Sequence, residues 1–325
     1  MTSLSSNPRI ISSVKKIIFE LGNLKKSESL YIITDNSTKE LGNVFSIISS
    51  NYGINYLHDS FPIAEMHGVE PPERIGKTMK EKDLIIGLTK FSLSHTNARR
   101  EAQAHGKRYL SLADFSPEIL MHPALFANYN ECSKNAETLS KKLTSGNRLK
   151  IKTKAGTDME FDISTRKGNY APGYVNEKIK LGSPPDIEAN IAPIEKKSNG
   201  VLVIDGSIPY PELGKLREPI TLTILNGKIQ SIKGKESIKN ILISLFERNG
   251  EKSKILAEVG IGFNTKANVI GNMLLDEGTF GTMHVGFGSN IALGGRNEIN
   301  FHLDFVFYSH ELYIDGQLIK MDNMG

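Results

Sequence analysis

Residues 29–112 alternate short apolar runs with longer segments in which apolar residues recur every three or four positions. Short apolar runs indicate buried strands, and the longer spacing indicates amphipathic helices. The pattern predicts strands at 29–35, 54–58, 83–89 and 107–112, and helices at 39–50, 72–80 and 95–105. Strands that alternate with helices are typical of βαβ units, so we expect a parallel sheet with helices on both faces.

The pattern changes after a long helical segment over residues 116–143, which ends at Ser145-Gly146-Asn147. Beyond it, apolar and polar residues alternate, as in half-buried strands. Strands are predicted at 148–156, 157–165, 200–204, 220–225 and 228–232, followed by a helix at 237–247. Asn226-Gly227 joins two of these strands and predicts a tight hairpin.

These patterns define the expected fold class and domains. We expect an α/β plus α+β protein, with an N-terminal parallel-sheet βαβ domain over residues 1–146 and a β-rich metal-binding domain over residues 147–325. The length of 325 residues also exceeds the usual size of a single core. Hydrophobic residues at 39% are sufficient for two cores.

Charge and cysteine content narrow the possible functions. Lys and Arg number 40 against 36 Asp and Glu, without a concentrated basic arm, which argues against nucleic-acid binding. A single cysteine, Cys132, excludes an internal disulfide and a thiolate metal cluster. No segment is typical of a signal peptide or a membrane span, so we expect a soluble, cytoplasmic protein. The TDNSTKELGN segment after the first strand lacks the glycines of a dinucleotide site.

The candidate chemistry lies in the last seventy residues, where glycine occurs together with histidine and acids. In FHLDFVFY the apolar residues predict a strand, and the two-residue period places His302 and Asp304 on the same face. An imidazole beside a carboxylate is a suitable pair of ligands for a divalent cation. Chance also produces such pairs, because acids are common.

Other polar residues of this tail have two interpretations. Glu258 lies in the apolar run AEVGIGFN, where a carboxylate needs a cation or a metal. His284 in GTMHVGFG is either a further ligand or a core histidine bonded to backbone. Asp276 is interpreted as part of a solvated turn. Glu277 has two interpretations, as part of the same turn or as a group that orients an imidazole.

Asp205 and Asp315 stand in the similar settings VIDGS and YIDGQ. An Asp-Gly pair most often marks a hairpin turn, so both aspartates are interpreted as structural.

Segments along most of the chain resemble the M29 metallopeptidases, the family represented by thermophilic aminopeptidase T, and especially its shorter members described as leucyl aminopeptidases. The resemblance is carried by FSLSHTNARREAQAHGKRYLSL in the first half. In the second half it is carried by PPDIEANIAP, VIDGS, AEVGIGFN, DEGTFGTMHVGFGSN, GGRN and FHLDF.

The resemblance implies a set of ligands and a reaction. The metal ligands would be Glu188 (with Glu195 as the nearby competitor), Glu258 as a bridge, His284, His302 and Asp304. Such a site would hold a divalent metal, two ions of zinc, cobalt or manganese, that activates water to release N-terminal residues from a short-peptide or small-molecule substrate. Glu188 or Glu258 would move the proton. The family also implies a homodimer, with no nucleic-acid or membrane partner.

One position departs from the family pattern. M29 aminopeptidases place a catalytic tyrosine seven residues after the histidine that corresponds to His284, and Ile291 stands there. Because that hydroxyl would stabilise the tetrahedral intermediate, another donor is needed. Tyr308, Tyr313 and Arg296 are the candidates.

Two alternative functions remain. The same fold is similar to that of 2,5-dihydroxypyridine 5,6-dioxygenase, a mononuclear non-haem Fe(II) enzyme that cleaves an aromatic ring, and His284 or another histidine with His302 and Asp304 would supply its triad. The dioxygenase pattern, however, has a histidine where Glu258 stands. The third hypothesis is a non-catalytic, metal-stabilised binding protein, and Ile291 favours it.

Overall fold

The computed structural model describes residues 4–321 and divides the chain into two compact units. The first contains the chain up to Tyr129 together with Pro172–Pro185, and the second contains Asn130–Ala171 and the chain from Asp186 onward. This division differs from the boundary at residue 146 that the sequence predicts. The helix that precedes residue 146 lies with the second unit, where the Thr144 hydroxyl accepts a hydrogen bond from Gly168 N at 2.9 Å.

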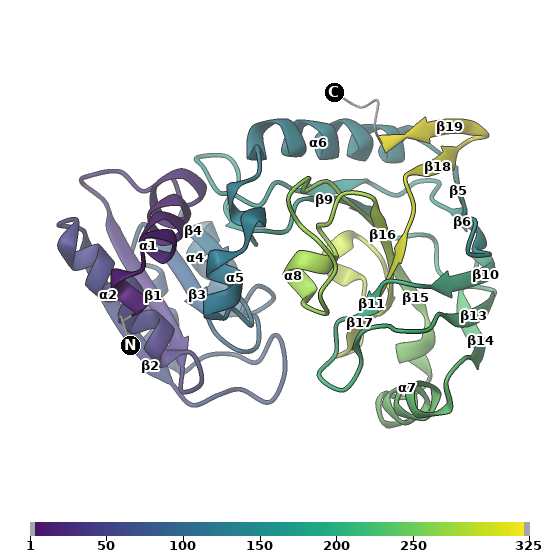
Figure 1. The fold of residues 1–325 in the computed structure, drawn as a ribbon, viewed down its shortest axis with the longest axis horizontal. Helices are drawn as coiled ribbons and strands as arrows, with labels where there is room; N and C mark the ends of the chain where they lie inside the picture. Colours follow the sequence, from purple (N-terminus) through teal and green to yellow (C-terminus); the bar gives the residue numbers. More distant parts are fainter. Residues whose placement is uncertain (1–3, 322–325) are drawn as a thin grey trace. The chain divides into compact units, whose positions relative to one another are not determined.

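The first unit is built on a five-stranded parallel sheet with the order β2-β1-β3-β4-β8 (Figure 1). Its strands are β1 (Ser29–Asp35), β2 (Asn55–Phe61), β3 (Leu84–Leu88), β4 (Arg108–Ser111) and β8 (Leu181–Gly182). Four of them lie where the apolar runs predict strands. The parallel βαβ arrangement of the first half is therefore confirmed.

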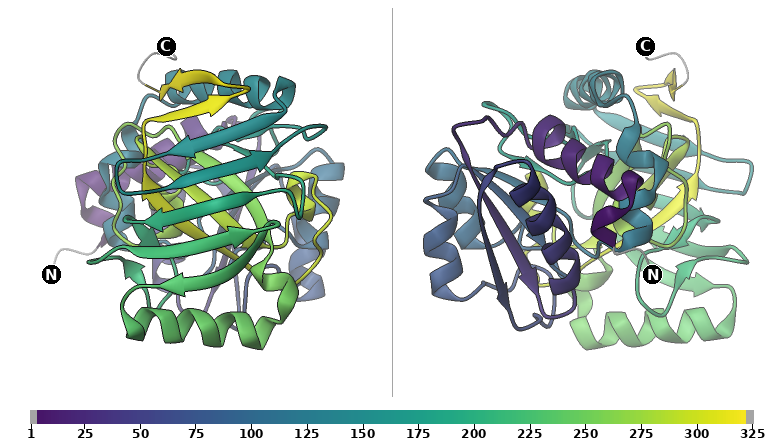
Figure 2. Two further views of the ribbon diagram at one scale, coloured as in Figure 1. Left: turned by 90° about the vertical axis from the view of Figure 1, so that its right-hand side faces the viewer. Right: turned by 60° about the vertical axis from the view of Figure 1, so that its left-hand side comes forward.

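Helices cover both faces of this sheet, as the amphipathic spacing predicts. They are α1 (Pro8–Lys15), α2 (Lys39–Asn51), α3 (Glu73–Met79), α4 (Asn97–Ala104) and α5 (Pro117–Met121), with a π-helix η2 over Lys16–Leu21. Ile75 and Met79 of α3 and Ala102 of α4 pack with Tyr31 and Ile85 in one buried cluster. The turned view in Figure 2 (right) shows α1 and α2 over the opposite face.

The strand β8 was not predicted. Tyr109 N donates a hydrogen bond to Lys180 O at 2.8 Å, and Tyr109 pairs with Leu181 in a parallel register. The chain therefore returns to the edge of the first sheet after a strand of the second unit. A two-residue strand carries too little periodicity to be recognised from the sequence.

The second unit contains two seven-stranded antiparallel sheets. The outer sheet has the order β14-β13-β10-β6-β5-β18-β19, and the inner sheet has the order β12-β11-β17-β16-β15-β9-β7. Figure 2 (left) shows the two sheets as stacked layers, with the outer sheet in front. This architecture confirms the expected β-rich second half.

The strands of the outer sheet are β5 (Arg148–Lys152), β6 (Asp158–Asp162), β10 (Asn199–Ile204), β13 (Ile220–Leu225), β14 (Lys228–Lys233), β18 (Glu311–Ile314) and β19 (Gln317–Lys320). Those of the inner sheet are β7 (Asn169–Ala171), β9 (Glu188–Ile191), β11 (Ser207–Ile208), β12 (Gly214–Lys215), β15 (Leu256–Gly262), β16 (Thr282–Gly288) and β17 (His302–Tyr308). Helix α7 (Glu236–Asn249) packs Phe246 against Phe305 of β17. The short helices of this unit are η4 (Glu251–Lys254), α8 (Met273–Asp276) and η5 (Ile291–Leu293).

The single helix predicted over residues 116–143 is wrong in detail. The structure has α5, a 3-10 turn η3 (Pro123–Phe126) and then α6 (Tyr129–Ser145). Pro123 prevents a continuous helix because it lacks an N–H and disfavours helical backbone at the preceding residue. His122 accordingly adopts an extended conformation with ψ of 138°.

Two of the three predicted turns are hairpins. Asn226-Gly227 and Asp315-Gly316 both have positive φ at both positions, as a tight hairpin requires. Asp205-Gly206 is instead the point where the chain passes from β10 of the outer sheet to β11 of the inner sheet. There the Asp205 carboxylate accepts a hydrogen bond from Tyr308 N at 3.0 Å.

Among residues 4–321, no helix is both long and apolar enough to cross a membrane.

The two hairpin glycines offer a matched test of backbone crowding. A Cβ on Gly227 would lie 2.7 Å from Lys196 N, whereas a Cβ on Gly316 would meet nothing within 4 Å. Both have positive φ, so Gly316→Ala is expected to cost about 1–2 kcal/mol of backbone strain. Gly227→Ala adds a steric clash and should lower the unfolding temperature further, as measured by calorimetry. Equal losses for both variants would show that the clash is relieved.

Candidate metal centre

Four neighbouring strands of the inner sheet carry the five predicted ligands. Glu188 begins β9, Glu258 lies on β15, His284 lies on β16, and His302 and Asp304 lie on β17. The order β17-β16-β15-β9 makes these strands adjacent although their sequences span more than a hundred residues. The sheet therefore brings together all five residues named from the sequence.

The register of the strands places the five side chains on one face. Glu258 pairs with Gly286, and Gly286 pairs with Asp304. His302 lies two residues from Asp304 on the same strand, and two-residue steps return a side chain to the same face. Gly260, which pairs with His284, and Gly262, which pairs with Glu188, extend the pattern along β15.

Glycines form the floor of this site. A Cβ on Gly260 would lie 2.0 Å from His284 Nε2, and a Cβ on Gly286 would lie 2.6 Å from His302 Nε2 and 2.7 Å from Asp304 Oδ1. Any side chain at these two positions would occupy the space that the imidazoles and carboxylates use. The glycine-rich composition of the tail thus has a steric cause.

The ligand atoms form two groups that share Glu258. One group contains Glu188, Glu258 and His284, and the other contains Glu258, His302 and Asp304, with the ligand atoms of each group within 4.8 Å of one another. His284 Nε2 is 3.2 Å from Glu188 Oε2 and 3.8 Å from Glu258 Oε1. His302 Nε2 is 3.3 Å from Glu258 Oε2 and 3.2 Å from Asp304 Oδ1. Each oxygen of Glu258 therefore faces a different histidine.

Hydrogen bonds from outside the groups orient two of the side chains. His302 Nδ1 donates to Ser289 O at 2.8 Å, which leaves Nε2 directed at the carboxylates. Asn190 Nδ2 donates to Glu188 Oε1 at 2.6 Å. His302 keeps 31% of its side chain exposed, whereas His284 is fully buried, so solvent reaches the centre on the side of His302.

Burial and neighbouring groups of opposite charge shift the pKa values of Glu188, Glu258, His284 and His302 in opposite directions. Burial raises the pKa of Glu188 to about 7, although His284 opposes the shift. Burial acts on Glu258 in the same direction, but the favourable interactions of its carboxylate with His284 and His302 outweigh burial and lower its pKa to about 2. Burial disfavours the charged form of His284, yet Glu188 and Glu258 raise its pKa to about 9. The pKa of His302 is also raised, since Asp304 and Glu258 outweigh burial.

The site fits a divalent metal on chemical grounds. Among residues 4–321, no lysine or arginine forms an ion pair with the three carboxylates of the two groups. Glu188 Oε2 and His284 Nδ1 are buried and lack a hydrogen-bond partner. Buried carboxylates need cations, and oxygen and imidazole donors are those that borderline divalent ions prefer. Sulfur is absent from the set.

Two further acids, Asp186 and Glu277, interact electrostatically with the ligand groups. The sequence does not single out Asp186, and it leaves Glu277 either as part of a turn or as a group that orients an imidazole. Asp186 Oδ1 and Glu277 Oε1 are buried without hydrogen-bond partners. Burial raises the pKa of both carboxyls, and the charges of Glu188, Glu258 and Asp304 raise it further. The apolar neighbours of Asp186 in PPDIEANIAP are a signal that could have singled it out.

Asp276 does not lie in a solvated turn, contrary to the prediction. It is fully buried, and its carboxylate accepts hydrogen bonds from the Ser207 hydroxyl at 2.6 Å and from the backbone of Ile270 and Gly271 at 2.8 Å each. The two backbone donors and the hydroxyl replace water. Asp276 thus fixes the segment that precedes α8.

Glu195 lies in a separate network, away from the ligand groups. Its carboxylate forms a 2.5 Å ion pair with Arg166 and accepts hydrogen bonds from Asn290 Nδ2 and Arg296 N. These contacts fix the loop between β16 and β17. Glu188, not Glu195, is therefore the acid that the structure places beside His284.

Within the described part of the chain, the three candidate replacements for the family tyrosine, which are Tyr308, Tyr313 and Arg296, form no hydrogen bond or ion pair with the five ligands. Ile291 is 47% exposed in the loop after β16. Tyr308 lies six residues from His302 on β17, about 20 Å along the strand. Tyr313 belongs to the outer sheet, and the Arg296 side chain forms no hydrogen bond or ion pair with the five ligands.

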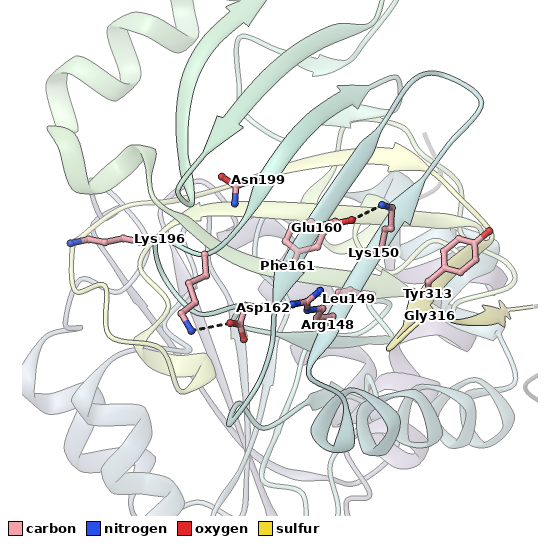
Figure 3. A pocket seen from close by; sticks show the side chains of 11 residues that line it. Arg148, Leu149, Lys150, Glu160, Phe161, Asp162, Lys196, Asn199, Tyr313 and Gly316 are labelled. Atoms are coloured by element: carbon pink, nitrogen blue, oxygen red, sulfur yellow. Dashed lines mark hydrogen bonds and ion pairs between the residues drawn. The ribbon is translucent and has the colours of Figure 1, made fainter.

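A pocket of about 600 Å³ lies elsewhere, on the outer sheet (Figure 3). Lys150 forms an ion pair with Glu160 at 2.5 Å, and Lys197 forms one with Asp162 at 3.0 Å. Figure 3 shows the first pair, with Tyr313 at the edge of the pocket. It contains none of the five predicted ligands. Of its basic residues, Lys150 and Lys197 are paired with acids, and among residues 4–321 no ion pair involves Arg148 or Lys196.

The comparisons with known proteins concern almost the whole chain. The family model described as 2,5-dihydroxypyridine 5,6-dioxygenase (NicX) matches residues 13–323. The structure of 2,5-dihydroxypyridine dioxygenase from Pseudomonas putida KT2440 is similar with a TM-score of 0.78 at 17% identity, over 96% of this chain and 95% of that one. AmpT from Thermus thermophilus is similar with a TM-score of 0.66 at 14% identity, over 96% and 97%. None of the curated proteins matches the sequence.

The ligand cluster and these matches define the class as a metalloenzyme. The chain belongs to the 2,5-dihydroxypyridine 5,6-dioxygenase family. The sequence resemblance gave M29 as the leading family and the dioxygenase as the alternative, and the matching family model favours the alternative. The likeness to AmpT, an M29 aminopeptidase, supports a relation in fold.

The glycine floor provides a test of the site. Gly286→Ala should weaken the binding of a divalent metal by about tenfold or more, because the added Cβ displaces His302 and Asp304 from their positions. Isothermal titration with Mn²⁺, Zn²⁺ and Fe²⁺ measures the loss. Gly316→Ala is the control, since a Cβ there would meet nothing within 4 Å and the residue lies in the β18–β19 hairpin of the outer sheet, which carries none of the ligands. Unchanged affinity in Gly286→Ala would contradict the assignment of this face as the metal site.

Proposed function

We propose that the protein is a metal-dependent dioxygenase that cleaves a hydroxylated aromatic ring, with the metal held by Glu258, His302 and Asp304. The match of the family model to residues 13–323 is the observation that carries this proposal. The three donors come from one sheet face and form one of the two ligand groups. A ferrous ion held there would supply the redox chemistry that ring cleavage by dioxygen requires.

The surrounding residues have separate roles in this proposal. The Ser289 carbonyl fixes the ring of His302, so that Nε2 is available as a ligand. The partly exposed side of His302 is where a planar substrate would enter. Glu188 Oε2 would hold the proton of a substrate hydroxyl, since its pKa of about 7 suits proton exchange near neutral pH.

A second candidate is a hydrolase of the aminopeptidase type. The observation that favours it is the shared Glu258, whose two oxygens face the two histidines of separate ligand groups. Iron oxygenases usually combine two histidines with one carboxylate, whereas each group here has one histidine and two carboxylates. Two ions bridged by Glu258 would lower the pKa of a shared water.

Substitutions of the candidate ligands distinguish a site that binds one metal ion from a site that binds two. If one ion lies at Glu258, His302 and Asp304, Glu188→Gln should retain it, and His302→Ala or Asp304→Ala should abolish binding. If two ions share Glu258, Glu188→Gln should reduce two ions to one, and Glu258→Gln should remove both. Metal content after anaerobic purification and reloading, measured by mass spectrometry, gives the count.

His105→Ala is the control for the metal count, because His105 is exposed in the first unit and hydrogen bonds only to backbone. In every variant the first unit should remain folded, as judged by calorimetry. Full metal content in His302→Ala and Asp304→Ala would refute the proposed ligands for both candidate functions.

Substrate assays separate the two reactions. The Fe(II)-loaded protein should consume dioxygen in the presence of 2,5-dihydroxypyridine or a related ring diol, and His302→Ala should lose this activity by several orders of magnitude. The Zn²⁺-, Co²⁺- or Mn²⁺-loaded protein should be inactive toward aminoacyl amides. Release of amine from these amides, without oxygen uptake, would instead establish the hydrolase.

A further inference from the structure

The first unit contains a buried guanidinium whose charge is not neutralised. Arg99 of α4 is 9% exposed. Its Nε donates to Ser94 O at 2.6 Å and its Nη1 donates to Gln103 Oε1, both of which are neutral acceptors. No hydrogen bond is present at Nη2, and no carboxylate among residues 4–321 forms an ion pair with Arg99.

A second buried arginine in the same unit, Arg108, has its charge neutralised by a carboxylate. Arg108 of β4 is 2% exposed, and its Nη2 donates to Glu28 Oε2 at 2.5 Å while its Nη1 donates to Asn23 O at 2.6 Å. A buried charge without a partner is costly, and burial lowers the pKa of Arg99 accordingly. The contrast indicates that Arg99 lacks an anion.

Three buried serine hydroxyls form a hydrogen-bonded group that includes Ser94, the residue whose carbonyl accepts a hydrogen bond from Arg99 Nε. Ser94, whose carbonyl binds Arg99, has its own hydroxyl 2.9 Å from that of Ser92, and the Ser92 hydroxyl is 3.2 Å from that of Ser111. All three serines are buried. Ser111 ends β4, and Ser92 and Ser94 lie in the loop after β3, so the group is at the carboxyl edge of the parallel sheet. Ligands of open α/β sheets bind at this edge.

A phenol is a further buried group without a partner. Tyr109 Oη has no hydrogen bond, although the residue is almost completely buried. Tyr109 and Arg99 interact electrostatically, since the guanidinium lowers the pKa of the phenol against the larger effect of burial. Tyr109 and Arg99 are therefore buried residues whose Oη and Nη2 have no hydrogen-bond acceptor within residues 4–321, and the charge of Arg99 is not neutralised there.

We propose that Arg99, with the hydroxyls of Ser92, Ser94 and Ser111, binds a small carboxylate. A carboxylate carries one negative charge and accepts parallel hydrogen bonds from a guanidinium edge, which matches the one buried, unneutralised charge of Arg99. A phosphate would need more positive charge. The nearby Lys90 is paired with Asp114 at 2.5 Å, and Arg100 is exposed and donates to Asn97.

Acetate and formate are the probes for this site in the full-length protein. Titration at constant ionic strength, with sodium chloride as the balancing salt, should raise the unfolding temperature of the wild type progressively as the acetate concentration increases. Arg99→Gln should lower the acetate affinity by at least about tenfold, because it removes the charge-assisted hydrogen bonds. Arg100→Gln is the matched control, since it removes a neighbouring exposed guanidinium, and it should bind as the wild type does.

A second measurement does not depend on the stability of the variant. In the wild-type protein, the Arg99 side-chain ¹⁵Nε–¹H resonance, assigned through Arg99→Lys, should shift during the acetate titration and saturate as the site fills. Absence of this shift, equal stabilisation of Arg99→Gln and wild type, or stabilisation by inorganic phosphate but not by acetate or formate would overturn the proposal.

Discussion

The structure of the second unit depends on one electrostatic constraint, which is the burial of Glu188, Glu258 and Asp304 together on one sheet face, where no lysine or arginine of the described part of the chain neutralises them. Two histidines alone do not balance these charges, and buried Asp186 and Glu277 add to the repulsion. Such an arrangement is costly in a low-dielectric environment unless a cation is bound. The metal would therefore contribute to stability as well as to chemistry.

Backbone geometry makes this concentration of ligands possible. The register of β15, β16 and β17 alternates ligand and glycine across the strands, so that Gly260 and Gly286 leave the space that His284, His302 and Asp304 fill. Hydrogen bonds from Asn290 and Arg296 to Glu195 fix the loop between β16 and β17. The same loop orients His302, whose Nδ1 donates to Ser289 O. Rigid strands hold the ligands, and one partly exposed imidazole marks the open side.

One fold is shared by a ring-cleaving dioxygenase and by AmpT, so the fold does not select the reaction. The two candidate reactions differ in the number of metal ions that Glu258 would bind. That number depends on the side chains within a few ångströms of the Glu258 carboxylate. The first unit has a different chemical character. Its unneutralised Arg99 lies at the edge of a parallel sheet, whereas the acids of the second unit lie on the face of an antiparallel one.

The sequence by itself determined the two halves, most strands of the parallel sheet and the hairpin at Asn226-Gly227, because period and turn chemistry are local properties. It also singled out Glu258, His284, His302 and Asp304 as candidate ligands, and the family resemblance added Glu188. Tertiary structure decided the rest. The return of β8 to the first sheet, the burial of Asp276, and the separation of Glu195 from Glu188 follow from contacts between distant segments. The division of the ligands around Glu258 was likewise set by strand register, because only the pairing of β15 with β16 and of β16 with β17 fixes which side chains meet.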